Sequence, residues 1–208
     1  MPFTNRRDAA DRLAEALKGY QGRHPLILAI PRGAVPMGQR LAQALEGELD
    51  VVLVRKLGAP GNPELAVGAV DESGGLYLAP FAQTLGADAA YVEAEKSRQL
   101  VTLRARRAQL GPSRRPADPA GRVVIVVDDG LATGATMMAA LRAVRARGPL
   151  TLVCAVPVAP QETLDAVAAL ADAVVCAQVP RDFQAVGQFY RDFPQVDDSQ
   201  VAALLARG

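Results

Sequence analysis

The sequence predicts an α/β fold in which a mostly parallel sheet is covered by helices on both faces. Short, uninterrupted apolar runs such as 26–30 and 123–127 are typical of strands that are buried on both sides. Segments with apolar residues at helical spacing alternate with these runs. With 208 residues, half of them hydrophobic, the chain is long enough to bury one large core. Ligands of such folds bind beyond the carboxyl ends of the strands, so the residues that follow each strand are the first candidates for function.

The first half of the chain alternates between segments with helical spacing and short apolar runs that are expected to be strands. Residues 5–20 have helical spacing, and residues 26–30 form the first expected strand, which Pro31, Arg32 and Gly33 end. The elements expected next are a helix over 36–45, a strand over 51–54 and short strands over 66–70 and 76–78. Residues 57–64 are rich in Gly and Pro, so we expect them to form a loop.

The second half contains the longest helical candidate, residues 88–110, which Gly111 and Pro112 end. Residues 111–121 are a connector rich in Pro and Arg. The remaining elements are expected as a strand from 123, a helix to about 147, a strand over 150–157, a helix over 161–171 and a strand over 173–177. Composition changes at Pro180. We therefore expect residues 1–180 to form the core and residues 181–208 to form a tail that packs on it.

Composition and charge argue against several classes of partner. The 23 basic and 22 acidic residues nearly cancel, so bulk charge predicts neither a nucleic-acid nor a membrane partner. Cys154 and Cys176 lie in apolar runs, where cysteine acts as a small hydrophobe, so we expect no disulfide and a reducing compartment. The first residues lack the apolar stretch of a signal peptide, and no apolar run is long enough to span a bilayer. A soluble, cytoplasmic protein is expected.

The most informative segment is 123–136, where an apolar strand runs into Asp128 and Asp129 and then into a loop of small residues. Carboxylates only accept hydrogen bonds, so an adjacent pair suits vicinal hydroxyls or hydrated cations. The loop offers backbone N–H groups and the hydroxyls of Thr133 and Thr136 at the start of a helix, where anions bind well. One segment can therefore hold a sugar by its hydroxyls and its phosphate together.

Other interpretations of this segment fit less well. An ordinary Asp-Gly turn after a strand is the main alternative, and the dipeptide by itself would favour it. Gly130 and Gly134 lack the lysine of a Walker loop, and no GxGxxG sequence opens a helix anywhere in the chain.

Residues 123–136 resemble the 5-phosphoribosyl-1-pyrophosphate (PRPP) binding motif of the type I phosphoribosyltransferases, among which the chain is most similar to an uncharacterised group. The resemblance implies that Asp128 and Asp129 hold the ribose hydroxyls. It assigns the 5′-phosphate to a loop formed by Gly130, Leu131, Ala132, Thr133, Gly134, Ala135 and Thr136. It also implies the fold of that family, with residues 181–208 as a small C-terminal hood.

The same resemblance implies an activity. Such an enzyme transfers the phosphoribosyl group to a nitrogenous base and releases pyrophosphate. Mg²⁺ is generally held there by PRPP oxygens and waters, so direct coordination by Asp128 and Asp129 is not assumed. A homodimer is expected on the same ground.

Two further segments resemble the parts of the family that bind pyrophosphate. Residues 29–34 resemble its pyrophosphate loop, which places Arg32 and Gly33 in the site and implies a cis Pro31–Arg32 bond. Residues 54–58 resemble the Arg-Lys pair that ends the second strand of adenine-type members, which brings Lys56 towards the pyrophosphate and lets residues 58–64 fold over the site. The alternatives are a solvated turn residue for Arg32 and a solvent-facing charge for Lys56.

The acid or base of the reaction is not identified. Glu64 is a possible group, but a surface carboxylate is the favoured interpretation. His24 is the only histidine and precedes Pro25 on a predicted turn, so we do not expect it to be a general base.

The tail is unusually aromatic, and its role is open. Its aromatic residues are Phe183, Phe189, Tyr190 and Phe193. They could stack on a flat heterocycle at the position of the family's hood. Packing against the core is an equal or better interpretation, because residues 186, 189 and 193 have helical spacing. No segment matches a known hood, so the acceptor base is unidentified.

Residues 96–122 form a local basic stretch in this neutral chain. Its basic residues are Lys96, Arg98, Arg104, Arg106, Arg107, Arg114, Arg115 and Arg122. A nucleic-acid surface is one interpretation, but a solvated helix face or a dimer rim is favoured. The hypotheses are therefore a Mg²⁺-dependent transferase that uses PRPP, which we prefer, a PRPP or nucleotide sensor without turnover, and a nucleic-acid-binding regulator.

Overall fold

The computed structural model describes residues 1–110 and 115–206, without the side chain of Glu64. Its centre is a five-stranded sheet in the order β2-β1-β6-β7-β8, in which every neighbouring pair is parallel. The strands are β1 (Leu26–Ala29), β2 (Glu48–Val51), β6 (Val123–Val127), β7 (Thr151–Val158) and β8 (Ala173–Gln178). The predicted parallel sheet is confirmed.

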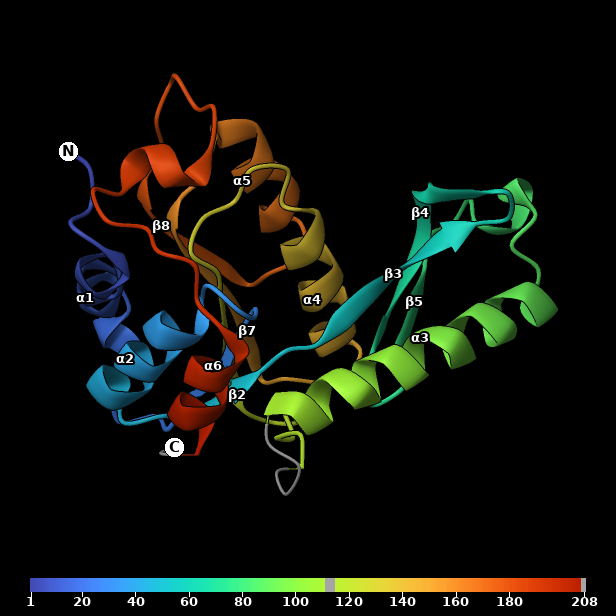
Figure 1. The fold of residues 1–208 in the computed structure, drawn as a ribbon, viewed down its shortest axis with the longest axis horizontal. Coiled ribbons are helices and arrows are strands. Elements are labelled where there is room, and N and C mark those ends of the chain that lie inside the picture. Colours follow the sequence, from blue (N-terminus) through green and yellow to red (C-terminus); the bar gives the residue numbers. More distant parts are fainter. Residues whose placement is uncertain (111–114, 207–208) are drawn as a thin grey trace.

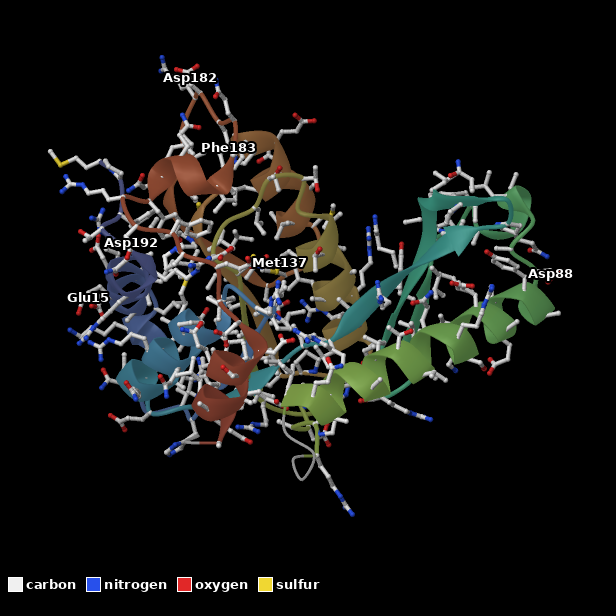
Figure 2. The ribbon with its side chains drawn as sticks, in the orientation of Figure 1. Glu15, Asp88, Met137, Asp182, Phe183 and Asp192 are labelled. Atoms are coloured by element: carbon white, nitrogen blue, oxygen red, sulfur yellow. The ribbon has the colours of Figure 1, made fainter. Side chains whose placement is uncertain are left out.

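Helices cover both faces of this sheet (Figure 1). One face packs against α1 (Arg6–Ala16) and α2 (Val35–Leu45). The other face packs against α4 (Ala135–Arg145) and α5 (Gln161–Ala168). Alternate residues of a strand enter the two clusters, as Ile125 and Val126 do, which explains why the strands are apolar without interruption. Met137 of α4 lies near the centre of the molecule (Figure 2).

An arm formed by residues 54–110 projects from the core (Figure 1). It contains a separate antiparallel sheet of β3 (Val54–Ala59), β4 (Asn62–Asp71) and β5 (Leu76–Leu78). The long helix α3 (Ala89–Leu110) runs along it, and Asp88 marks its outer end (Figure 2). Short 3₁₀ turns lie at Lys18–Tyr20, Gln83–Leu85 and Val186–Phe189.

Two predictions made from the sequence are wrong in this region. The strand expected over 51–54 is not one element, because β2 ends at Val51 and Val54 begins β3 in the other sheet. The loop expected over 57–64 is instead a β-hairpin with its turn at Pro60 and Gly61. A register shift at Gly58 accommodates the irregular sequence, and glycine is required there because a Cβ would lie 2.6 Å from Cα of Pro63.

Buried charges anchor the base of the arm. Arg107 of α3 donates to Asp50 Oδ1 at 2.7 Å and to Glu72 Oε2 at 2.6 Å. Asp50 is 1% exposed, and its second oxygen accepts from the backbone of Ala117 at 2.8 Å. Arg107 is thus a buried structural residue and not part of a solvated face. Arg114 and the predicted helix end at Gly111 and Pro112 lie outside the described residues.

The tail after β8 returns to the N-terminal segment and ends in α6 (Asp198–Leu205). Phe3 donates through its backbone N–H to Phe189 at 2.7 Å and accepts from Arg191 at 2.9 Å. Val201 and Leu205 of α6 are buried in the same cluster as α1 and α2. The division of the chain at residue 180 stays a prediction. Within the described ranges, no helix has the length and apolar character needed to cross a membrane.

Candidate functional site

The candidate site lies where the order of the central sheet reverses. β1 and β6 are neighbours, Ala29 pairs with Val127, and the chain leaves β1 towards β2 on the opposite side. The carboxyl ends of two such strands form the crevice in which open α/β sheets bind ligands. Pro31 and Arg32 follow β1, joined by a cis peptide bond as expected, and Asp128 and Asp129 follow β6.

Asp129 is fixed by three neighbours that are distant in sequence. Nε and Nη2 of Arg6 donate to its Oδ2 at 3.0 and 2.8 Å. The Tyr190 hydroxyl donates to its backbone oxygen at 2.7 Å. Gly33 lies so close that a Cβ at that position would be 2.1 Å from Oδ2. Among the described residues nothing donates to Oδ1 of Asp129, so this oxygen can accept a ligand hydroxyl.

Arg6 is itself held on three sides. Its Nη1 donates to the backbone oxygen of Pro194 at 2.6 Å, and its guanidinium lies 3.9 Å from the centre of the Phe193 ring. The Phe193 ring stacks on Tyr190, with ring centres 4.5 Å apart. Arg6 and the role of Tyr190 could not be predicted from the sequence, because nothing local distinguishes them from the other basic and aromatic residues.

Asp128 has a different environment from its neighbour. Its Oδ1 accepts from the backbone N–H of Asp129 at 2.9 Å. Part of the residue reaches solvent, but burial of the carboxyl group and the adjacent charge of Asp129 raise the pKa of Asp128 to about 8. The two acids therefore differ in environment: Asp129 is paired with the Arg6 cation, whereas burial of Asp128 favours the protonated form of its carboxyl group.

The loop after the acids is open to a ligand. Thr133 and Thr136 are exposed. In the part of the chain that the structure describes, the N–H groups of Ala132, Thr133, Gly134 and Thr136 donate to no protein group. Gly134, at φ +70°, occupies the N-cap position just before α4 and provides no side-chain cap. Free N–H groups at the start of a helix are suited to binding an anion, and α4 is eleven residues long.

Contacts with α5 and the tail, on the side of the loop away from solvent, fix the shape of residues 130–134. The buried Thr163 of α5 donates its hydroxyl to the backbone oxygen of Ala132 at 2.7 Å. A Cβ at Gly134 would lie 2.7 Å from the Thr163 methyl, and one at Gly130 would lie 2.6 Å from Val186. Leu131 is buried, and its N–H donates to Val158 at 2.9 Å. Gly130 and Leu131 thus shape the loop, whereas Ala132, Thr133 and Thr136 face the solvent.

Cationic side chains lie on the side of the site that faces the arm. A cavity of about 650 Å³ between β3, α3 and the start of α4 is lined by Arg55, Lys56 and Thr136, among others. A second cavity of about 270 Å³ is lined by Pro31, Arg55, Arg106 and Thr136. Both cavities share Arg55 and Thr136, so Lys56 lies on a surface that reaches the predicted phosphate loop although it belongs to the arm and not to the central sheet.

Arg32 is exposed, and its charge partner in the described ranges is Asp198 of α6, at 3.8 Å from Nη1. The structure thus brings together Arg32, Gly33, the two acids and the loop to Thr136. His24 precedes β1 and therefore lies at the opposite, amino end of the sheet, away from the site. The side chain of Glu64 lies outside the described residues.

The tail aromatics pack within the protein. Tyr190 is 7% exposed, and burial, followed by the charge of Asp129, raises the pKa of its hydroxyl. Phe183 stacks on Phe189 with ring centres 5.5 Å apart, and both pack against the core. Phe183 lies near the tip of the tail loop (Figure 2). In this structure the rings pack with one another and against the core, and Phe183, Phe189 and Phe193 stay partly exposed.

Comparisons with known proteins agree with this geometry. Residues 4–194 match the family model described as "Phosphoribosyl transferase domain". Over 208 residues the chain is 43% identical to two Mycobacterium tuberculosis proteins, each named "Putative phosphoribosyl transferase", MT0597 and Rv0571c. The match covers 99% of this chain and 46% of each relative, so the chain spans about half the length of the curated relatives it matches.

Solved structures share the fold. The crystal structure of TT1426 from Thermus thermophilus is 49% identical, with a TM-score of 0.92, and the match covers 100% of this chain and 99% of that one. The AQ2163 protein from Aquifex aeolicus is 14% identical, with a TM-score of 0.51, over 88% of this chain and 76% of that one, which shows a common fold alone.

Proposed function

Because the chain belongs to the phosphoribosyl transferase domain family, we propose that it binds PRPP and transfers the phosphoribosyl group to a nitrogenous base with release of pyrophosphate. The 5′-phosphate would lie on the loop from Gly130 to Thr136. The ribose hydroxyls would bind Asp128 and Asp129, and the pyrophosphate would face Arg32, Gly33 and Lys56.

One observation carries this proposal. Unused N–H donors at the start of α4 lie directly after two carboxylates, of which Asp129 keeps one oxygen without a donor in the described part of the chain. Donors for a phosphate and acceptors for hydroxyls are therefore within one short segment, as a phosphorylated sugar requires. The loop is exposed at Ala132, Thr133 and Thr136.

The proposed reaction breaks the bond between ribose C1 and a pyrophosphate oxygen and forms a bond between C1 and a base nitrogen. The nitrogen loses a proton, and both bonding electrons of the broken bond leave with pyrophosphate. Positive charge develops on the sugar ring, as in glycoside hydrolysis, and the carboxylate of Asp129 would stabilise that charge. Arg32 and Lys56 would stabilise the negative charge on the leaving group.

Mg²⁺, which the family generally uses, fits this set of donors. Among the described residues no three His, Cys, Asp or Glu side chains converge as a metal-binding group, whereas two adjacent carboxylates suit a hydrated ion that its ligand helps to hold. PRPP oxygens and waters would hold the ion near Asp128 and Asp129. Bound there, it would offset charge on the pyrophosphate.

The test is calorimetric titration of PRPP with Mg²⁺ into the wild type and Asp129→Asn. Loss of a charge-assisted hydrogen bond costs about 1.5–3 kcal/mol, so the dissociation constant should rise by about 10- to 100-fold. Asp165→Asn makes the same chemical change on the exposed side of α5 and should leave the affinity unchanged. Equal affinity in the two variants would reject the assigned role of Asp129.

A sensor without turnover is the second candidate. It is favoured by the packing of the tail aromatics against the core and against one another, because these contacts use ring surface that would otherwise stack on a base. A panel of purines and pyrimidines assayed for pyrophosphate release separates the two candidates. Release with any base identifies a transferase, whereas PRPP binding without release identifies a sensor.

Two further proposals accompany this function, and one hypothesis is dropped. We propose a homodimer, by analogy with the family, and the cytoplasm as compartment, since Cys154 and Cys176 are both free. We do not retain nucleic-acid binding by the basic stretch. Much of its charge is paired within the protein, as Arg98 is with Glu95 and Arg122 with Glu48.

A further inference from the structure

The C-terminal helix α6 contributes a carboxylate to the edge of the candidate site. α6 lies beyond residue 194, where the match to the family model ends. The helix is nevertheless a rigid part of the molecule, because Val201 and Leu205 are buried and Asp197 and Gln200 form a reciprocal capping box. Asp198 is its first residue, and its position is therefore set by the core.

Asp198 links two arginines from separate elements. Nη1 and Nη2 of Arg106, from α3 of the arm, donate to its two oxygens at 2.7 and 2.5 Å. Nη1 of Arg32, from the loop after β1, lies 3.8 Å from its Oδ1. Arg106 also lines the cavity of about 270 Å³ that Pro31 and Thr136 border. One carboxylate therefore spaces two cations around the place proposed for pyrophosphate.

We propose that Asp198 is a positioning residue, which holds Arg32 and Arg106 so that both guanidinium groups face the bound pyrophosphate. This inference rests on the proposed function for the identity of the ligand. Arg32 is exposed, and an exposed arginine without a partner samples many rotamers. Asp198 restricts that sampling and at the same time ties the arm helix to the loop after β1.

Whether removal of Asp198 weakens or strengthens pyrophosphate binding distinguishes a positioning role from a purely electrostatic one. Asp198 is an anion beside a site for an anion, so by charge alone its removal would strengthen pyrophosphate binding. If it positions the arginines, its removal weakens binding although the local positive charge increases. Weaker binding of pyrophosphate is therefore expected only if Arg32 and Arg106 lose their orientation.

The experiment compares Asp198→Asn with Asp197→Asn by calorimetric titration of PRPP and of pyrophosphate, each with Mg²⁺. Both variants lose one carboxylate from the same helix end, and asparagine at position 197 keeps the helix cap. We expect Asp198→Asn to raise both dissociation constants by about three- to tenfold, and Asp197→Asn to leave them within about twofold. Asp198→Glu restores the carboxylate and should recover part of the affinity. Unchanged or tighter binding by Asp198→Asn overturns the inference.

A measurement on the ligand-free protein tests the positioning role of Asp198 independently of the proposed function. The ¹⁵N order parameter of the Arg32 Nε–H group should fall in Asp198→Asn and stay at the wild-type value in Asp197→Asn. An unchanged order parameter also overturns the inference. If the wild type binds neither PRPP nor pyrophosphate, the proposed function fails, and the order parameter alone then decides whether Asp198 holds Arg32.

Discussion

Replacing Gly33 with alanine tests whether Asp129 must occupy one position in the site. Gly33 does not adopt a left-handed backbone, so alanine fits its conformation and only the added methyl group acts. That methyl carbon would lie 2.1 Å from Oδ2 and 2.9 Å from Cγ of Asp129. It would also lie 3.3 Å from Nη2 of Arg6. The added methyl group therefore clashes with the ion pair between Asp129 and Arg6.

The size of the effect follows from these distances. A carbon and an oxygen that are not bonded rarely approach within roughly 3.3 Å, so the carboxylate must move by about 1.2 Å. The hydrogen bonds from Arg6, now 2.8 and 3.0 Å, would break or lose their alignment. Loss of a charge-assisted bond lowers the free energy of unfolding by about 1.5–3 kcal/mol. Misplacement of the hydroxyl acceptor should raise the dissociation constant of PRPP by about 10- to 100-fold.

The assay is urea unfolding together with calorimetric titration of PRPP, with Gly19→Ala as control, because a Cβ at Gly19 meets nothing within 4 Å. A second variant carries Gly33→Ala on an Asp129→Ala background. The clashing carboxylate is absent there, so the alanine at position 33 should cause little further loss. The reasoning is refuted if Gly33→Ala behaves like Gly19→Ala in both measurements.

Two other predictions concern the acids. Arg6→Met keeps much of the side-chain volume but leaves Asp129 without its cation, so the free energy of unfolding should fall by about 3–5 kcal/mol in urea titrations, and a change below about 1 kcal/mol would contradict the pairing. The pKa of Asp128 is about 8 in the folded protein against 3.8 as its ordinary value, so the folded state binds more protons between these values. The free energy of unfolding should therefore fall as pH rises from about 4 to 8, and Asp128→Asn should remove this part of the slope; identical slopes would refute the raised pKa.

The part of the site that could be predicted from the sequence is local. The two acids, the loop and the start of α4 are contiguous, so their order along the chain already places them at one edge of the sheet. The partners of the acids come from elsewhere. Arg6 is separated from Asp129 by 123 residues, and nothing in the sequence selects it from 23 basic residues. Only the three-dimensional packing, which brings α1 and the tail next to the residues that follow β6, makes that selection.

The error at residues 57–64 has a related cause. Gly and Pro argue for a loop when a segment is considered alone, but a β-hairpin tolerates them where strands shift register or lack a neighbour. Gly58 is placed where its backbone approaches Pro63, and Pro63 lies in the part of β4 beyond its pairing with β5. Pairing between β3 and β4 thus decides the conformation of residues 57–64, and this pairing cannot be recognised from the composition of the segment alone.

The position of Lys56 follows from this hairpin. A lysine at the end of a parallel strand would point into the crevice from the central sheet, whereas Lys56 belongs to β3 of the arm and lines the cavity between β3, α3 and α4. Arg32 remains on the loop after β1, on the core side. The two cations proposed for pyrophosphate are therefore carried by separate parts of the fold, and their spacing depends on how the arm is anchored. Because Arg107 binds Asp50 and Glu72 at the base of the arm, these buried charges help to set the spacing of Arg32 and Lys56 although they belong to neither proposed cation.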